Sequence, residues 1–197
     1  RDLADALAAF QASAAVAGEP DAGTAAFGTA DVVGREARAN LTALARWPDP
    51  AAHVQLLRDW TDTAFARLAP VFEERKRQGR VREGHGDLHL GNLVFLDDRI
   101  VAFDCLEFSP ELRWIDVVNE LAFLIMDLAE HGRAADGARL LNRWLDRTGD
   151  YAGLALWRWY VVYRALVRAK VTALRLDQPG LPAAESSQAR KAVSQYL

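Results

Sequence analysis

One short segment has the pattern of paired β-strands, in a chain whose other segments have the pattern of helices. Two apolar runs, Leu93–Leu96 and Ile100–Phe103, stand on either side of the polar residues Asp97-Asp98-Arg99. Two such runs around a polar turn predict a β-hairpin. No other segment predicts β structure in this way, so the rest of the fold has to be built from helices.

Apolar residues at helical spacing predict helices on both sides of this hairpin. We expect them at about residues 1–17, 29–45, 51–78, 114–130, 134–148, 153–176 and 183–196. The helix at 114–130 is apolar on nearly every side, so it should lie in the middle of the domain. The predicted fold class is mostly α (α+β). Residues 1–197 should form a single domain, because no repeat or low-complexity linker divides them.

Composition narrows the class of protein. Hydrophobic residues make up 51% and charged residues 26%, which is typical of globular proteins. A net charge of −3 argues against a nucleic-acid partner.

The single cysteine, Cys105, excludes an intrachain disulfide and fits a reducing compartment. We find neither a long apolar run nor a signal peptide, and therefore expect a cytoplasmic protein with no membrane partner. The first residue is Arg1 rather than Met, which we interpret as processing or excision from a longer chain.

Three oxygen-bearing side chains flank the hairpin. Asp87 and Asn92 precede its first strand, and Asp104 follows its second, so the turn should bring Asn92 and Asp104 together. Gly86 and Gly91 allow tight backbone bends on both sides of Asp87. Phosphoryl transfer from ATP needs a carboxylate that accepts a proton from the attacking hydroxyl, and hard oxygen ligands that hold Mg²⁺. Asp87 is the candidate for the first task, and Asn92 and Asp104 for the second.

This segment resembles the catalytic loop of the aminoglycoside phosphotransferase family, within the protein-kinase-like superfamily. The matching residues are His85-Gly86-Asp87-Leu88-His89, Asn92 and the pair Phe103-Asp104. The resemblance implies ATP and Mg²⁺ as cofactors, with Asp87 as catalytic base and with Asn92 and Asp104 as the ligands of the Mg²⁺ that accompanies ATP. It also implies that His85 holds the loop by hydrogen bonds.

Two further acids match the family less closely. Glu107 stands where some members carry an acid near the metal. Asp116 resembles the buried acid that caps the following helix and braces the catalytic loop. Residues 107–116 and 164–170 are similar to a bacterial subgroup of uncharacterised phosphotransferase-like proteins. In that subgroup this domain is often followed by a P-loop kinase domain, which is therefore a possible fused partner.

The chain departs from the family pattern in two places. Asp104 is followed by Cys105-Leu106 rather than Phe-Gly, which puts activation-loop switching in doubt. No Gly-rich strand pair with a lysine precedes His85, and no G-x-x-x-x-G-K-[ST] loop occurs. The chain therefore resembles the helical C-terminal lobe alone, without the N-terminal nucleotide-binding lobe. We expect that lobe to dock on exposed apolar residues near the first helix and around Leu93–Phe95.

The predicted function is ATP- and Mg²⁺-dependent phosphoryl transfer to a hydroxyl of a small molecule. An aminoglycoside-like or amino-sugar acceptor is suggested by the family resemblance alone. The alternative is a catalytically inactive docking or regulatory module fused to another domain. A third hypothesis is a metal hydrolase, because His85, Asp87 and His89 alternate and could share one face.

Three more residues are candidates for contacts with the acceptor. They are His89, Glu120 and Asp127. Glu120 and Asp127 recur at near-helical spacing and could face a cationic amine, but the same spacing fits a solvated stripe or partners for basic groups. His89 is equally compatible with a substrate contact and with a structural role.

Overall fold

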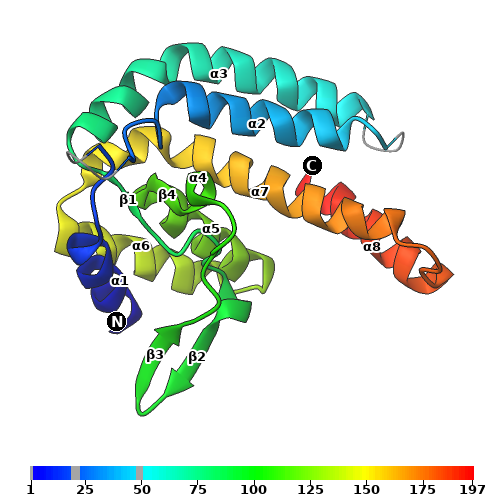
Figure 1. Cartoon of the computed structure of the whole chain (residues 1–197). Coiled ribbons are helices and arrows are strands. Elements are labelled where there is room, and N and C mark those ends of the chain that lie inside the picture. The colour runs from blue at the N-terminus through cyan, green and yellow to red at the C-terminus, as the bar shows by residue number, and fades with distance from the viewer. Residues whose placement is uncertain (1, 19–22, 48–50) are drawn as a thin grey trace.

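The computed structural model describes residues 2–18, 23–47 and 51–197. Helix α5 (Val117–Glu130) lies at the centre, packed against α6 (Ala134–Thr148) and α7 (Trp157–Leu174). Helices α2 (Ala30–Leu44) and α3 (Ala51–Arg77) run side by side, with α2 also lying against α7 (Figure 1). Three of the described helices lie at the periphery. Helix α1 (Asp2–Ser13) packs on α6, and α8 (Ala183–Tyr196) packs on α7. The short helix α4 (Pro110–Arg113) directly precedes strand β4 (Trp114–Asp116) and contacts it.

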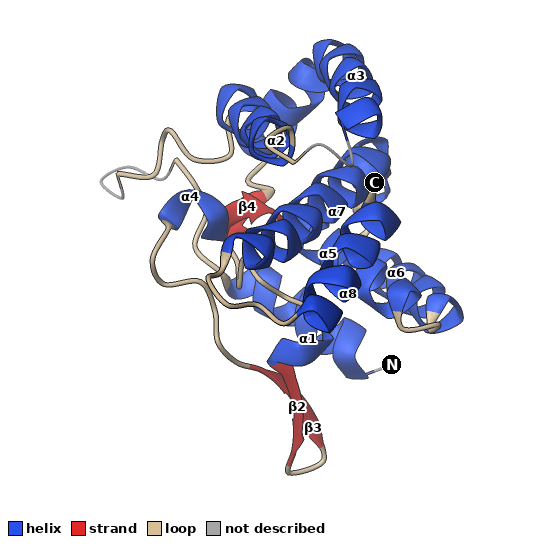
Figure 2. Ribbon diagram, turned by 90° about the vertical axis from the view of Figure 1, so that its right-hand side faces the viewer, coloured by secondary structure: helices blue, strands red, loops and turns tan. Residues whose placement is uncertain are grey.

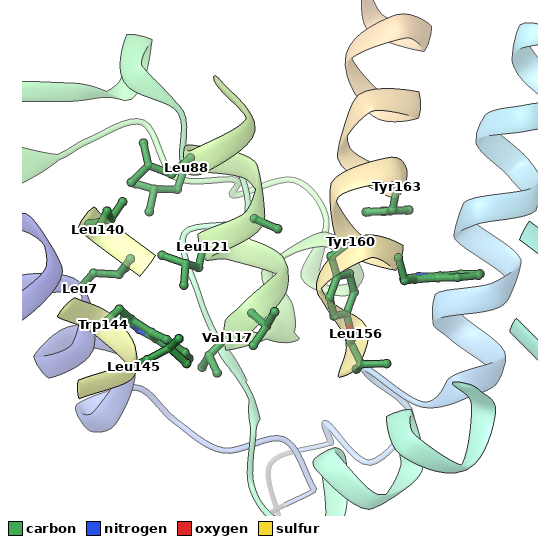
Figure 3. Packing of buried hydrophobic residues seen from close by; sticks show 14 of the residues in the cluster. Leu7, Leu88, Val117, Leu121, Leu140, Trp144, Leu145, Leu156, Tyr160 and Tyr163 are labelled. Atoms are coloured by element: carbon green, nitrogen blue, oxygen red, sulfur yellow. The ribbon is translucent and has the colours of Figure 1, made fainter. Parts of the chain in front are cut away.

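The central position of α5 follows from its sequence. Leu121, Ala122 and Leu124 are completely buried, and ten residues of this helix are buried in all. Its first turn is capped by Asp116, whose side chain accepts a hydrogen bond from the Val118 N–H. Figure 3 shows the cluster that surrounds α5, in which Leu121 lies with Leu88, Leu140 and Trp144. The prediction that this helix lies in the middle is confirmed.

The predicted hairpin is present as β2 (Leu93–Leu96) and β3 (Arg99–Ala102). Leu93 pairs with Ala102, and Leu96 pairs with Arg99. The two turn residues both have positive φ, 47° at Asp97 and 59° at Asp98. Two consecutive residues with positive φ make the tight turn that matches the twist of paired strands, and Asp tolerates this conformation. The hairpin extends away from the helices (Figures 1 and 2).

A second strand pair is present that the sequence pattern did not indicate. Strand β1 (Val81–Glu83) is antiparallel to β4 (Trp114–Asp116), and Val16 forms an isolated bridge to Arg82. The expectation of a helix beginning at about residue 114 is therefore wrong, since Trp114 lies in a strand and α5 begins at Val117. A strand of three residues is too short to show a period of two, and its pairing is set by a partner more than thirty residues away.

Two short helical turns precede α7 and α8. They are the 3₁₀ turns Tyr151–Leu156 and Arg175–Asp177, and a third such turn, Leu90–Asn92, leads into the hairpin. The fold class predicted from sequence, a mostly helical lobe of a protein-kinase-like fold with little β structure, is confirmed. Within the described ranges, no helix has both the length and the hydropathy that crossing a bilayer requires.

Candidate active site

The two short strands β1 and β4 set the position of the loop at residues 84–89. Strand β1 leads directly into this loop, and β4 leads directly into α5, so their pairing brings the loop to the first turns of α5. The Gly84 N–H donates to the carbonyl of Arg113 at 2.9 Å and extends the pairing by one residue. The backbone pairing with β4 therefore sets the position of the loop without any contribution from the loop's own side chains.

Glu120 holds the backbone of the loop. It is 1% exposed, and its Oε1 accepts hydrogen bonds from the N–H groups of His85 and of Gly86, the latter at 3.2 Å. Its Oε2 accepts from the side-chain amide of Gln11. A β-carbon on Gly84 would lie 2.8 Å from Glu120 Oε1, so a glycine is needed for this close approach. The sequence left open an acceptor-facing position, a solvated stripe or a partner for basic groups for Glu120, but the structure buries Glu120 against backbone N–H groups and Gln11.

His85 connects the loop to the end of the hairpin. Its Nε2 lies 2.8 Å from the carbonyl of Phe103, so this nitrogen carries the proton and donates. Its Nδ1 is then the acceptor for the Asp87 N–H, at 3.4 Å. The His85 carbonyl accepts from the Leu106 N–H at 3.0 Å. These contacts correspond to the loop-holding role that the resemblance implies for His85.

Asp87, His89 and Asn92 lie together. The amide nitrogen of Asn92 donates to the Asp87 carbonyl at 3.0 Å and to its carboxylate at 3.3 Å. His89 Nδ1 accepts from the Gly91 N–H, which leaves the His89 Nε2 as the nitrogen nearest Asp87, at 3.6 Å from Oδ2. The Asp87 side chain is 38% exposed, whereas Asn92 is buried. A carboxylate oriented by neighbours and still open to solvent is suited to accept a proton from a bound molecule.

The hairpin brings Asp104 next to Asn92. The Phe103 N–H donates to the Asn92 carbonyl at 3.0 Å, which continues the pairing of β2 and β3 by one residue. Asp104 is exposed and has a φ of 60°, a conformation uncommon for residues other than glycine. Glu107, also exposed, follows three residues later.

Asn92, Asp104 and Glu107 carry side-chain oxygen atoms of the kind that Mg²⁺ prefers. Asn92 uses its amide nitrogen within the loop, so Oδ1 is the atom left for a ligand. In the part of the chain that the structure describes, neither Asp104 nor Glu107 has a hydrogen-bond or ion-pair partner on its carboxylate. Free carboxylate and amide oxygens are the ligands that Mg²⁺ prefers in proteins.

The histidines do not form a transition-metal site. Both ring nitrogens of His85 are used by the backbone, so neither is free for a metal. Among residues 2–18, 23–47 and 51–197, no group of three His, Cys, Asp or Glu side chains has a metal-binding arrangement. The geometry therefore gives no support to the metal-hydrolase hypothesis.

Asp127 lies under the loop rather than facing solvent. It is 1% exposed, and its Oδ2 accepts from the Leu90 N–H at 2.8 Å. Its Oδ1 accepts from the Arg168 guanidinium at 2.9 Å. Of the alternatives that its spacing allowed, partnership with a basic group is the one the structure contains. Asp127 thus has no free oxygen directed at an acceptor.

Asp116 caps α5, but it does not touch the loop. Its carboxylate accepts from the Val118 N–H and from Arg75, which also donates to Asp150. Burial alone would lower the pKa of Arg75, but the hydrogen bonds that it donates to Asp150 and Asp116 raise its pKa above the ordinary value. Asp116 was expected both to cap the following helix and to brace the loop, and the structure assigns these two tasks to different residues. Asp116 joins α5 to α3, and Glu120 braces the loop.

Arg164 is not among the site residues that the sequence predicts, although it bonds the loop. It is 5% exposed on α7, and its Nη1 donates to the Gly86 carbonyl at 2.9 Å. In the sequence it is one of several basic residues along a helix, which ordinarily lie on the surface with their charged ends in water. The signal that could have found it is its place in the motif at residues 164–170.

A cavity of about 950 Å³ opens beside the loop, between α1 and the hairpin. His85 and Cys105 line it on the loop side, and Leu7, Phe10 and Val101 line it on the apolar side. Phe10 is 45% exposed and Val101 is 38% exposed, so the apolar wall continues onto the surface. Val94, Phe95 and Leu96 are exposed along the same hairpin. Exposed apolar residues are thus present where the sequence predicted them.

One comparison with known proteins identifies a family. The family model described as "Phosphotransferase enzyme family" matches residues 1–157. The uncharacterized proteins Rv2004c of Mycobacterium tuberculosis and Mb2027c of Mycobacterium bovis are each 34% identical over 166 residues. Each match covers 83% of this chain but 33% of the relative, so the chain spans about a third of their length. A comparison with solved structures finds no significant match.

Proposed function

The chain belongs to the phosphotransferase enzyme family, and on that premise we propose that the protein carrying it transfers a phosphoryl group from Mg·ATP to a hydroxyl of a small molecule. The observation that carries this proposal is the arrangement of Asp87 with Asn92. The Asp87 carboxylate is 38% exposed and accepts a hydrogen bond from the amide nitrogen of Asn92, whose side-chain oxygen has no partner among the described residues. The backbone of Asn92 pairs with that of Phe103, the residue before the exposed Asp104.

Asp87 acts as the general base in this proposal. The acceptor oxygen forms a bond to the γ-phosphorus, the bond from that phosphorus to the β-phosphate oxygen breaks, and the hydroxyl proton passes to Asp87. The carboxylate has to be both oriented and accessible for this step, and the bonds from Asn92 together with the 38% exposure of Asp87 support both requirements.

Asn92 and Asp104 are the proposed Mg²⁺ ligands, with Glu107 as a third candidate. Each has an oxygen that is unused within the described residues, and each follows or precedes a strand of the hairpin. Bound Mg²⁺ would neutralise charge on the phosphate oxygens. The chain's own contribution is to place Asn92 and Asp104 at the same end of the paired hairpin strands.

The acceptor is defined here only by its hydroxyl group. A cationic amine was one possible partner for Glu120 and Asp127, but both carboxylates are bonded within the protein. His89, whose ring lies 3.6 Å from Asp87, is the remaining candidate for a contact with the acceptor.

We further propose that a nucleotide enters the cavity between α1 and the hairpin, and that an N-terminal lobe or a fused P-loop domain completes the site. The cavity reaches His85 at the loop, and its apolar wall suits the base of a nucleotide. The exposed residues Phe10, Val94 and Phe95 suit a docked lobe.

Nucleotide turnover by the intact protein tests this proposal without knowledge of the acceptor. We expect Mg·ATP hydrolysis by the wild type, and its loss, by roughly 10²-fold or more, in Asp87→Asn. Asp97→Asn is the matched control, because Asp97 is an exposed acid in the hairpin turn and Asn tolerates its positive φ. Turnover that is indifferent to Asp87, or absent, would favour an inactive docking module.

A further inference from the structure

Arg164 is a buried cation that has no carboxylate partner. It is 5% exposed, and within the described parts of the chain no Asp or Glu forms an ion pair with it. Its Nε donates to the side-chain oxygen of Asn119 at 2.7 Å, and its Nη1 donates to the carbonyl of Gly86 at 2.9 Å. Burying a charge without an opposite charge raises the free energy of the folded state, and an apolar residue in this space would not raise it in that way.

Aromatic rings hold the guanidinium in place. Its central carbon lies 4.8 Å from the ring centre of Phe123 and 5.7 Å from that of Tyr163. Burial lowers the pKa of Arg164, and the nearby Tyr163, Glu120 and Asp87 oppose this effect. The guanidinium is thus fixed on three sides, by Asn119 and by two rings, and directed at the loop.

The carbonyl that Arg164 holds belongs to the residue immediately before the proposed base. Gly86 has a φ of 84°, and a β-carbon there would lie 2.8 Å from the Leu112 carbonyl. A glycine is required at this position, but glycine also leaves the backbone free to move. Its N–H is held by Glu120 and its carbonyl by Arg164, so both polar backbone groups of Gly86 are fixed by buried side chains of opposite charge.

We propose that Arg164 is a positioning residue for phosphoryl transfer, which fixes the Gly86–Asp87 peptide and thereby the direction of the Asp87 carboxylate. The inference rests on the proposed function for its catalytic consequence. Arg164 acts through the backbone of the loop, and its planar fork is what allows it to reach Asn119 and Gly86 at the same time.

Arg168, one turn further along α7, shows what a merely structural arginine does here. It also lies near the ring of Phe123, at 5.7 Å, but it pairs with the buried carboxylate of Asp127. Its side chain is 27% exposed, as is usual for a long cation at the edge of a core. The difference between the two arginines is that only Arg164 bonds the peptide next to Asp87.

The test compares Arg164→Lys and Arg164→Met in the intact protein. A lysine keeps the charge, but it cannot bond two acceptors in the geometry of the fork, and methionine keeps only the bulk. We expect kcat for Mg·ATP turnover to fall by up to roughly 10²-fold, with KM for Mg·ATP nearly unchanged. Arg158→Met is the control, since Arg158 is exposed on the same helix and lies over the ring of Trp60.

Amide hydrogen exchange gives a readout that does not need activity. In both Arg164 variants, exchange of residues 84–92 should become faster, while the other helices and the Arg158→Met control keep wild-type protection. If the wild type shows no turnover but the Arg164 variants show faster loop exchange, Arg164 fixes the loop as inferred and the proposed function is refuted. Wild-type kcat or wild-type loop exchange in Arg164→Lys would overturn the inference, as would a lower melting temperature with no change in the loop.

Discussion

At the scale of single residues, Glu120 determines whether the loop keeps its shape. Replacing it with glutamine changes its size little, but the amide group puts an N–H where only an acceptor fits. Glu120 accepts from two loop N–H groups and from Gln11, so Glu120→Gln leaves at least one buried donor without a partner. We expect a loss of about 1–3 kcal/mol in the free energy of unfolding, measured by denaturant titration.

Glu130→Gln is the matched comparison, because it makes the same change at the other end of α5. Glu130 is exposed, and its one partner within residues 2–18, 23–47 and 51–197 is the Tyr196 hydroxyl, from which a glutamine oxygen can also accept. The two variants should therefore differ clearly in stability. Equal unfolding free energies for Glu120→Gln and wild type would contradict the bracing role of Glu120.

The residues that sequence reasoning located and those it missed differ in the range of their contacts. Asp87 and Asn92 are five residues apart, and the bond between them is local. Glu120 reaches Gly86 across 34 residues, and Arg164 reaches it across 78. Their residue types suggest surface charges, and only the packing of α5 and α7 against the loop makes them buried. No periodicity within one helix carries that information.

At the scale of elements, the hairpin was predictable and the strand pair β1–β4 was not. The hairpin carries its own turn, Asp97-Asp98, and its own two apolar runs, so all its determinants lie within about ten residues. Strands β1 and β4 are three residues each and pair across the whole hairpin. Their pairing nevertheless decides the site, because it sets the loop against α5.

The ion pairs between α1 and α6 should make stability depend on pH. Hydrogen bonds from Arg147 and Arg143 hold the pKa of Asp5 below its ordinary value of 3.8. A carboxylate with a depressed folded pKa stabilises the fold above its ordinary pKa, and the stabilisation is lost as the pH falls below that value. Between about pH 6 and about pH 3, the wild type should therefore lose more thermal stability than Asp5→Asn.

The effect should be small, because these side chains are partly exposed and salt screens them. Asp98→Asn is the control, since Asp98 is an exposed acid with no ion pair within the described residues. It should follow the wild type across the same pH range. Identical acid profiles for the wild type and Asp5→Asn would show that α1 is held to α6 by its apolar contacts alone.

At the scale of the whole molecule, the apolar surface on α1 and the hairpin is the feature that a single lobe does not explain. Phe95 is 68% exposed, Leu96 55% and Phe103 48%. Large apolar side chains gathered on one protruding hairpin mark an interaction surface more often than a free one. The cavity beside the loop shares Ile100 and Val101 of this hairpin in its apolar wall, so a lobe docked on the hairpin in the proposed way would also border the cavity.

These residues alone should therefore bind Mg·ATP poorly. The cavity is bounded by α1, the loop and the hairpin, and the chain contains no Gly-rich phosphate loop that could hold the β- and γ-phosphates. We expect a Kd of about 1 mM or weaker for the 197-residue chain by titration calorimetry, and at least about tenfold tighter binding by the intact protein.

Phe95→Ser tests how much the apolar surface of the hairpin contributes to Mg·ATP binding, separately from the loop. In the intact protein it should weaken Mg·ATP binding toward the value of the chain alone, because the covering lobe loses an anchor of large apolar area. In the chain alone the same substitution should change nothing, since nothing is docked there. Micromolar binding by the chain alone would mean that these elements already form a complete nucleotide site. The exposed hairpin would then serve a partner unrelated to ATP.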